Sequence, residues 1–160
     1  MRTLAFWQPY GSLMLRGKIE TRVVEVGRKP PFPLGDYLFY TTQKATDKEL
    51  LEKWCGEEIL DDMLDILVKE PTYTLDGYAI AIAKLVSIRP MTKEDESKCF
   101  IKYFGTTEKV DKEGKVRYYH QNCLIFENIE RIEPFKFEFG KQGVGIANQQ
   151  TINKIKIIKP

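Results

Sequence analysis

Apolar side chains alternate with polar or small ones in several short segments of this chain, a period of two that is typical of β-strands. Between Tyr78 and Ile88 the alternation reads Ala-Ile-Ala-Ile-Ala, which indicates a central strand closely approached by its neighbours. At Phe135–Phe139 phenylalanines alternate with Lys136 and Glu138, which indicates one buried face. The strands predicted from this pattern cover Thr3–Phe6, Glu20–Val26, Asp36–Thr42, Tyr78–Ile88, parts of Val116–Ile132, and Phe135–Phe139.

A helical period follows the first strand and recurs further along the chain. Pro9 suits the first turn of a helix that ends at Arg16, and Gly17 fits its C-terminal cap. Because Gln8 precedes a proline, the sequence predicts an extended backbone there and an exposed amide at a turn. The other predicted helices cover residues 47–67, with an interruption near Gly56, and residues 92–99.

Proline-rich and glycine-containing segments separate these elements. Residues 27–33 include three prolines within four positions, so this segment is predicted to be a loop. Residues 109–115 are polar and include Gly114, which predicts an exposed loop or hairpin tip. About six short strands and two or three helices predict an α+β protein, a small and mostly antiparallel β-barrel with the helices packed outside it.

Length and composition favour a single domain that covers residues 1–160. Hydrophobic residues make up 42% of the chain, yet no apolar run is long enough to cross a membrane and the first residues lack a signal-peptide pattern. Three cysteines at irregular spacing and a single histidine, His120, argue against a disulfide framework and against a zinc site. We therefore expect a cytoplasmic protein that uses no metal or cofactor and does not contact membranes.

The net charge of +2 hides an uneven distribution. Residues 1–44 carry seven Lys and Arg against three acids, and residues 134–160 carry five against one, so each end has a net charge of +4. The middle of the chain, residues 45–133, has a net charge of −6. If the fold brings the two ends together, they form a positive surface that attracts phosphates. Charge that serves only solubility would give the same counts, and the counts alone do not separate the two interpretations.

Polar and charged residues gather just after the first predicted helix. Lys18 lies beside its end, and in the following strand Glu20 and Arg22 point to one face while Thr21 points to the other. Near the C-terminus, the segment 140–143 reads Gly-Lys-Gln-Gly, and its glycines allow close approach of a ligand. These groups are placed for a ligand, although a solvated surface helix with a salt bridge would show the same pattern.

The order and spacing of these motifs resemble the ASCH domain family of the PUA-like superfamily. The similarity covers residues 4–13, which read Leu-Ala-Phe-Trp-Gln-Pro-Tyr-Gly-Ser-Leu, then Gly17-Lys18 and Glu20-Thr21-Arg22, and Gly-Lys-Gln-Gly at 140–143. The family pattern is two residues longer between its glycine and its glutamate than this chain is. The resemblance implies a PUA-like β-barrel with a cleft between barrel and helices that faces RNA or a nucleotide.

The resemblance also implies which side chains line that cleft. Lys18, Arg22 and Lys141 would meet phosphates, and Tyr10 or Trp7 would stack on a base. The full set of implied ligand contacts is Gln8, Tyr10, Ser12, Lys18, Glu20, Arg22, Lys141 and Gln142. The partner expected from this set is RNA or a nucleotide-like ligand.

Hydrolysis is the second function that the resemblance implies. Some small proteins of the superfamily are amidohydrolases that remove an acyl group from a modified cytidine with a lysine, a threonine and a glutamate. In this chain Lys18 would act with Thr21, or with Glu20 in the place of the threonine. Their helical glutamate would correspond to Glu94 or Glu96.

Ribonuclease-like relatives would need a general base, for which His120 is the candidate by residue type. Because the shortened loop at Gly17-Lys18 displaces the lysine, binding ranks above hydrolysis and we expect little or no deacylation. A protein-interaction module ranks third. A closed cleft and a large apolar patch would mark it, and its protein partner would be unknown.

Overall fold

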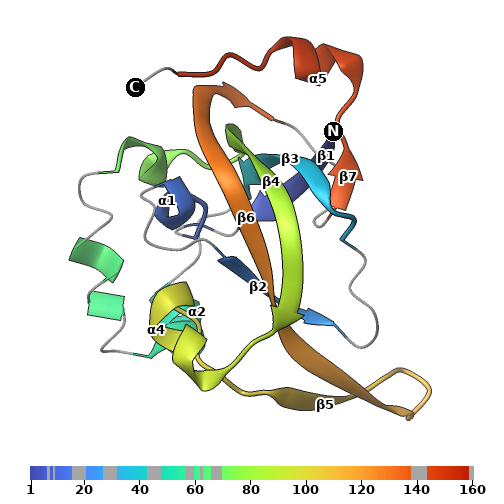
Figure 1. Ribbon diagram of the computed structural model, residues 1–160. Coiled ribbons are helices and arrows are strands. Elements are labelled where there is room, and N and C mark those ends of the chain that lie inside the picture. Colours follow the sequence, from blue (N-terminus) through green and yellow to red (C-terminus); the bar gives the residue numbers. More distant parts are fainter. Residues whose placement is uncertain are drawn as a thin grey trace.

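A mixed β-sheet of seven strands forms the centre of the computed structural model (Figure 1). The structure describes residues 1–6, 8, 10–15, 21–26, 32–42, 48–56, 60–61, 63–65, 70–137 and 144–158, and at residues 21–26, 48, 50, 97 and 144 only the backbone. The strands are β1 (Arg2–Phe6), β2 (Thr21–Val26), β3 (Gly35–Thr41), β4 (Tyr78–Pro90), β5 (Thr106–Val110), β6 (Val116–Lys136) and β7 (Val144–Ile146).

Six of these strands follow the order β2-β6-β4-β3-β1-β7, and β5 extends the sheet beside β6. β1 and β3 run parallel, whereas the other pairings between described strands are antiparallel. The predicted α+β class and the mostly antiparallel sheet are thereby confirmed. No pairing among the described strands joins β2 to β7, so closure of the sheet into a barrel stays a prediction.

β6 is a single strand of 21 residues, where the sequence predicted several shorter ones. Pro134 lies within this strand, where the register between β4 and β6 shifts, between the pairs Ala81–Arg131 and Ala79–Phe135. A proline has no N–H to donate, and a bulge leaves its position outside the regular ladder, so the strand continues through it. β6 therefore pairs with β4 along one part of its length and with β2 and β5 along another.

The predicted hairpin tip is shorter than expected. Lys109 and Val110 belong to β5, a strand that the polar sequence did not predict, and the turn itself covers residues 111–115. Gly114 adopts a positive φ of 79°, which a residue without a side chain reaches at little cost. β7 was also missed, because three residues are too few to show a period.

The helices are short and lie around the sheet. The predicted helix at 9–16 is observed as α1 (Tyr10–Leu15), and the one at 92–99 as a 3₁₀ turn, η2 (Lys93–Asp95), followed by α4 (Glu96–Cys99). The predicted segment 47–67 contains α2 (Lys48–Cys55), the break at Gly56, and helical residues at 60–61 and 63–65. The sequence did not predict η1 (Pro71–Thr74) or α5 (Gln149–Asn153). Among the described helices, none is long and apolar enough to cross a membrane.

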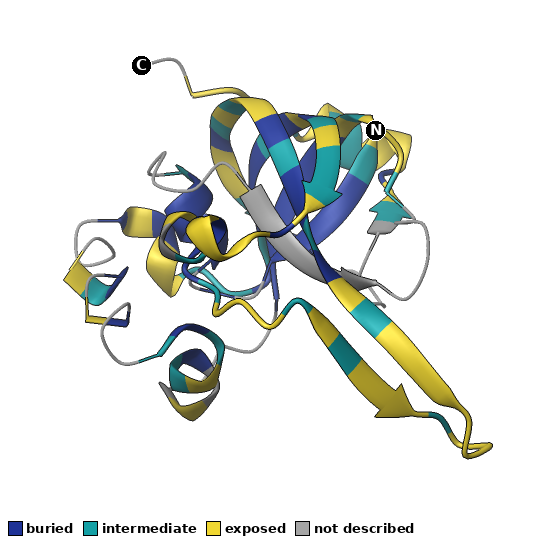
Figure 2. Cartoon of the chain, turned by 60° about the horizontal axis from the view of Figure 1, so that its bottom comes forward, coloured by how far each residue is buried: buried dark blue, intermediate teal, exposed yellow. Residues whose placement is uncertain are grey.

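Two apolar cores occupy the two faces of the sheet, because successive residues of a strand point to opposite faces. On the face covered by α1, the ring of Phe39 lies 4.6 Å from that of Phe6 and 4.8 Å from that of Phe126. A Cβ atom at Gly11 would lie only 3.2 Å from the Phe6 Cβ, so glycine there allows α1 to approach the sheet. The smaller core on the other face consists of Ala5, Leu38, Tyr40, Ala79, Ile132 and Phe137, and Ile155 packs against it. Buried residues accordingly follow the strands in the centre of the molecule (Figure 2).

A salt bridge at the end of β4 gives the fold a predictable response to acid. Arg89 binds Asp95 through two hydrogen bonds of 2.6 Å, and the N–H and hydroxyl of Thr92 donate to the same carboxylate. The guanidinium of Arg89 lowers the pKa of Asp95 below its ordinary value, and the N–H of Thr92 lowers it further. In the unfolded chain the pKa of an aspartate is about 3.9. At pH values above this, a carboxyl whose pKa is lowered by folding stabilises the folded state.

We therefore expect the contribution of Asp95 to be lost as the pH falls below about 4. The Asp95→Asn variant should be less stable than the wild type at neutral pH and should lose less stability on acidification. Urea unfolding midpoints at neutral and acidic pH measure both. A variant whose midpoint falls as steeply as that of the wild type would contradict the assignment.

Candidate functional site

Three of the predicted ligand residues are described with their side chains, and all three are buried. Gln8 precedes α1 and is 3% exposed, while Tyr10 and Ser12 lie within α1 and are 9% and 0% exposed. The expected exposed amide of Gln8 is therefore wrong, because the 3₁₀ turn η1 supplies partners that draw the amide inward.

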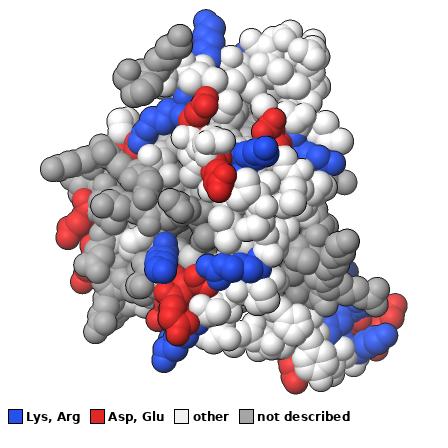
Figure 3. Space-filling view, viewed as in Figure 1, with Lys and Arg blue, Asp and Glu red and all other residues white. Residues whose placement is uncertain are grey.

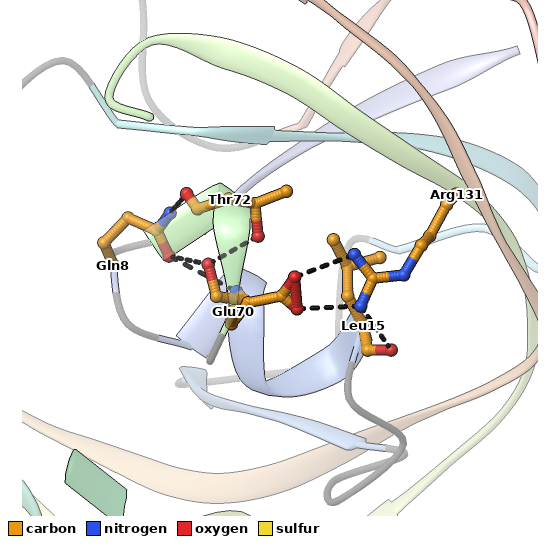
Figure 4. Close-up of polar contacts among 6 residues, drawn as sticks. Gln8, Leu15, Glu70, Thr72 and Arg131 are labelled. Atoms are coloured by element: carbon orange, nitrogen blue, oxygen red, sulfur yellow. Dashed lines mark hydrogen bonds and ion pairs between the residues drawn. The ribbon is translucent and has the colours of Figure 1, made fainter. Parts of the chain in front are cut away.

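Gln8, Ser12 and Thr72 form one buried hydrogen-bond network (Figure 4). The Gln8 Nε2 donates to the carbonyls of Thr72 at 2.8 Å and Leu75 at 3.3 Å. Its Oε1 accepts from the hydroxyl and the N–H of Ser12, at 3.0 and 3.3 Å. The hydroxyls of Ser12 and Thr72 lie 2.9 Å apart. The network fastens the start of α1 to η1 and uses both atoms of the Gln8 amide.

Tyr10 connects α1 to the segment after α4. Its hydroxyl donates to the carbonyl of Phe100 at 2.9 Å, and its ring centroid lies 6.1 Å from that of Trp54. Burial raises the pKa of the Tyr10 hydroxyl above its ordinary value. The polar groups of Gln8, Tyr10 and Ser12 thus have internal partners, and their contact with a ligand stays a prediction.

A buried ion pair that the sequence analysis missed lies beside this network. Arg131 of β6 donates to both carboxylate oxygens of Glu70, at 2.8 and 2.7 Å, and to the carbonyl of Leu15 at 3.3 Å. The side chain of Glu70 is 0% exposed and that of Arg131 is 35% exposed. The carboxylate raises the pKa of Arg131. Because 61 positions separate the two residues, no local sequence signal indicates the pair.

Backbone hydrogen bonds bring the ends of four segments to one edge of the sheet, hereafter the convergent edge. Thr42 donates to the carbonyl of Phe6 at 3.0 Å, Gly77 to that of Thr42 at 3.0 Å, and Phe137 to that of Gly77 at 2.8 Å. These bonds join the ends of β1, β3 and β6 to the start of β4. Gln8 follows Phe6 by two positions, so the turn before α1 begins at the same edge.

The structure places the remaining predicted site residues only in part. Lys141 and Gln142 fall outside the described residues, between Phe137 at the convergent edge and Val144, which pairs with Leu4 of β1. Of the two residues that flank the segment 138–143, Phe137 is therefore held by Gly77 and Val144 by β1.

Lys18 and Glu20 also lie outside the described residues, between the end of α1 and the start of β2. Thr21 and Arg22 are placed by their backbone alone, opposite Ile125 and Leu124 of β6.

The other candidate acids and the candidate base lie elsewhere. Glu94 is exposed on η2, and Glu96 accepts a hydrogen bond of 2.9 Å from the N–H of Tyr103. Glu94 lies in η2 and Glu96 begins α4, and α4 contacts β2. His120 is exposed on β6, with its Nδ1 2.9 Å from the Thr106 hydroxyl, as expected for a residue at the solvent-facing part of a strand. In the described part of the chain no three His, Cys, Asp or Glu side chains are grouped to hold a metal ion.

Comparison with known proteins identifies the fold. Neither a protein-family model nor a curated protein sequence matches the chain. Solved structures do match: ASCH from Zymomonas mobilis has a TM-score of 0.51 at 11% identity, over 96% of this chain and 91% of that one. A point mutant of the same protein has a TM-score of 0.50 at 12% identity, over 96% and 92%. This chain therefore has an ASCH-like fold, as the resemblance predicted.

Proposed function

We propose that this ASCH-like domain binds RNA or a nucleotide-like ligand at the convergent edge. The observation that carries the proposal is the chain of backbone hydrogen bonds through Phe6, Thr42, Gly77 and Phe137. These bonds hold the end of β1 and the end of β6 at the same edge of the sheet, with β3 and β4 between them, and the two strands lead into the two basic ends of the sequence. We expect the positive charges of those two ends to meet in this region.

Described cations add to the charge of this region. Lys136 is exposed at the last position of β6 and pairs with Tyr78 of β4. Lys154 lies with its Nζ 5.9 Å from the ring centroid of Phe135. Clustered cations attract a phosphodiester backbone independently of its sequence, and the ions that they displace make the affinity dependent on salt. Lys141 is the proposed phosphate contact beside this edge, and Lys18 and Arg22 are proposed to extend the phosphate-binding surface toward β2, where Arg22 lies opposite Leu124 of β6.

The test is binding of a labelled single-stranded RNA of about 20 nucleotides, measured by fluorescence anisotropy between about 50 and 200 mM salt. Wild-type affinity should fall as salt rises. Replacement of Lys18 and Arg22 together by alanine should weaken binding about 10-fold and reduce the slope of log affinity against log salt by roughly two.

Lys84→Ala is the matched control, because Lys84 is an exposed cation of the same sheet, opposite Asp36 and Glu127. It should leave the affinity nearly unchanged. Equal binding by the double variant and the wild type would reject the proposed surface.

A further inference from the structure

The segment between α4 and β5 presents aromatic side chains to solvent. It covers residues 100–105 and reads Phe-Ile-Lys-Tyr-Phe-Gly. Tyr103 is 38% exposed and Phe104 is 49% exposed, whereas Phe100 belongs to the core. In the space-filling view, uncharged side chains lie between the charged ones near α4 and those at the lower right of the molecule (Figure 3). Single exposed rings are common on protein surfaces, so what distinguishes this segment is how it is held.

One buried side chain of β6 fixes the backbone of the segment. Gln121 is 4% exposed, and its Oε1 accepts hydrogen bonds from the N–H groups of Phe104 and Gly105, at 2.7 and 3.1 Å. Its Nε2 donates to the carbonyl of Lys102 at 3.0 Å. The amide therefore binds the backbone on both sides of Tyr103, although these residues belong to neither a helix nor a strand.

Side chains of two helices hold the same segment. Glu96 of α4 accepts a hydrogen bond of 2.9 Å from the N–H of Tyr103, and the hydroxyl of Tyr10 in α1 donates to the carbonyl of Phe100 at 2.9 Å. The segment is thus ordered before a ligand arrives. A group that is ordered in advance loses less conformational entropy on binding.

The ring of Tyr103 lies against Gly105. A Cβ atom at Gly105 would be 3.2 Å from the Tyr103 hydroxyl oxygen, 3.4 Å from its Cζ and 3.9 Å from its Cε2. Such similar distances to three atoms of the phenol place the glycine over a face of the ring and not at its edge. Gly105 has a positive φ of 72°, which a residue without a side chain reaches at little cost. Because the backbone covers this face, the exposed area of the ring lies mainly on the opposite one.

A ring that is held in place with one open face suits the stacking of a nucleobase. Proteins that bind single-stranded nucleic acid stack its bases on aromatic side chains. The ring also lies near the phosphate contacts proposed above, because Gln121 is three positions along β6 from Leu124, which pairs with Arg22 of β2. At ~3.3 Å per residue this separation is roughly 10 Å, the length of about three stacked nucleotides.

We propose that an unpaired base of RNA stacks on the open face of Tyr103. The inference rests on the proposed function and deepens it, because it makes single-stranded RNA the class of ligand. Phosphate contacts attract any polyanion, whereas this ring selects a ligand that has bases. Bases within a duplex are already stacked on their neighbours and offer no free face. The ring has no charge, so it adds affinity without adding to the salt dependence.

The experiment compares ligands with and without unpaired bases on the variant Tyr103→Ala. The probes are a labelled single-stranded RNA of about 20 nucleotides and a duplex of the same length, measured by anisotropy, and inorganic polyphosphate, measured by calorimetry. The variant should bind the single strand about 10-fold more weakly, with an unchanged slope of log affinity against log salt. It should bind the duplex and polyphosphate like the wild type.

Two variants serve as controls for the ring. Tyr103→Phe keeps the ring and removes only the hydroxyl, so it should keep wild-type RNA affinity. A loss as large as that of Tyr103→Ala would assign the effect to the hydroxyl and overturn stacking. Tyr118→Ala removes another tyrosine, which is 53% exposed on β6, and should also bind RNA like the wild type. Thermal unfolding of each variant separates loss of the ring from loss of the fold.

The other outcomes distinguish this inference from the proposed function. Single-strand affinity that is unchanged in Tyr103→Ala overturns stacking and leaves the proposed function in place. Equal losses of RNA and polyphosphate affinity also overturn stacking, because polyphosphate has no base. A wild type that binds neither RNA nor polyphosphate overturns both proposals. A dimer that Tyr103→Ala dissociates without a change in RNA affinity assigns the ring to a contact between two copies of the chain.

Discussion

Replacement of Glu70 by leucine is expected to lower the free energy of unfolding by about 3 kcal/mol. The substitution leaves the guanidinium of Arg131 without the carboxylate that binds it through two hydrogen bonds, at 2.8 and 2.7 Å. The Arg131 side chain is 35% exposed and keeps its hydrogen bond to the carbonyl of Leu15, so water compensates part of the loss. The buried part of the guanidinium keeps its cost of desolvation and loses the attraction that offset it, which places the effect at the lower end of the range for a buried pair.

Thermal unfolding followed by circular dichroism should show a midpoint lower by roughly 10 °C. Glu130→Leu is the control, because Glu130 is an exposed acid of the same strand as Arg131 and should change the midpoint little. A double variant that also replaces Arg131 by methionine should recover much of the loss, since it removes the isolated charge. If Glu70→Leu unfolds at the wild-type temperature, the pair does not stabilise the fold.

Replacement of Gln8 by leucine is the second change with a large expected effect. It removes the donor to the carbonyls of Thr72 and Leu75 and the acceptor for Ser12, all within a buried network. Buried polar groups that lose their partners each cost about 1–3 kcal/mol, so we expect a loss of roughly 2–4 kcal/mol. The contacts that this variant loses are those that join α1 to η1.

Urea unfolding at neutral pH measures this loss, with Gln149→Leu as the control. Gln149 is exposed on α5 and its amide contacts only Asn153 within the described residues, so the control should remain close to the wild type. The same variants separate packing from ligand contact. A folded Gln8→Leu protein with unchanged stability but weaker RNA binding would assign Gln8 to the ligand and not to the core.

The fold was predictable where one local pattern fixes one element. The alternating alanines and isoleucines of β4 predicted a central strand, and Ala79, Ala81 and Ala83 are indeed buried between β3 and β6. The prediction failed where a distant strand supplies the stabilisation. β5 has a polar sequence and forms because β6 pairs with it, and Pro134 stays within β6 because β4 shifts its register there. A period in one segment contains no information about such a partner.

The candidate site was predictable only where a local motif marks it, and not where its residues depend on partners far away in the sequence. The motif around Gln8 and Ser12 was recognised, but its interior partner Thr72 lies 64 positions from Gln8. The Glu70–Arg131 pair depends on the same kind of long-range contact and was missed entirely. The charge counts indicated a positive surface only if the two basic ends of the chain meet. The backbone bonds place Phe6 and Phe137 at one edge of the sheet, and Lys18 and Lys141, which follow them, lie outside the described residues, so the positive surface stays a prediction. Which side chains face a ligand depends on the folded arrangement and could not be read from the motifs.

The length of β6 has a consequence for how the protein is made. This strand pairs with β2, β4 and β5, so the partner of β2 is synthesised about 100 residues after β2 itself. While the ribosome is still producing the segment before β6, only the pairing of β1, β3 and β4 can form, and the inner edge of β4 is uncovered. Unpaired edges of this kind are where partly made chains associate. The nascent protein therefore has its greatest need of chaperone protection during translation of residues 91–135, before the strand that completes the sheet has emerged.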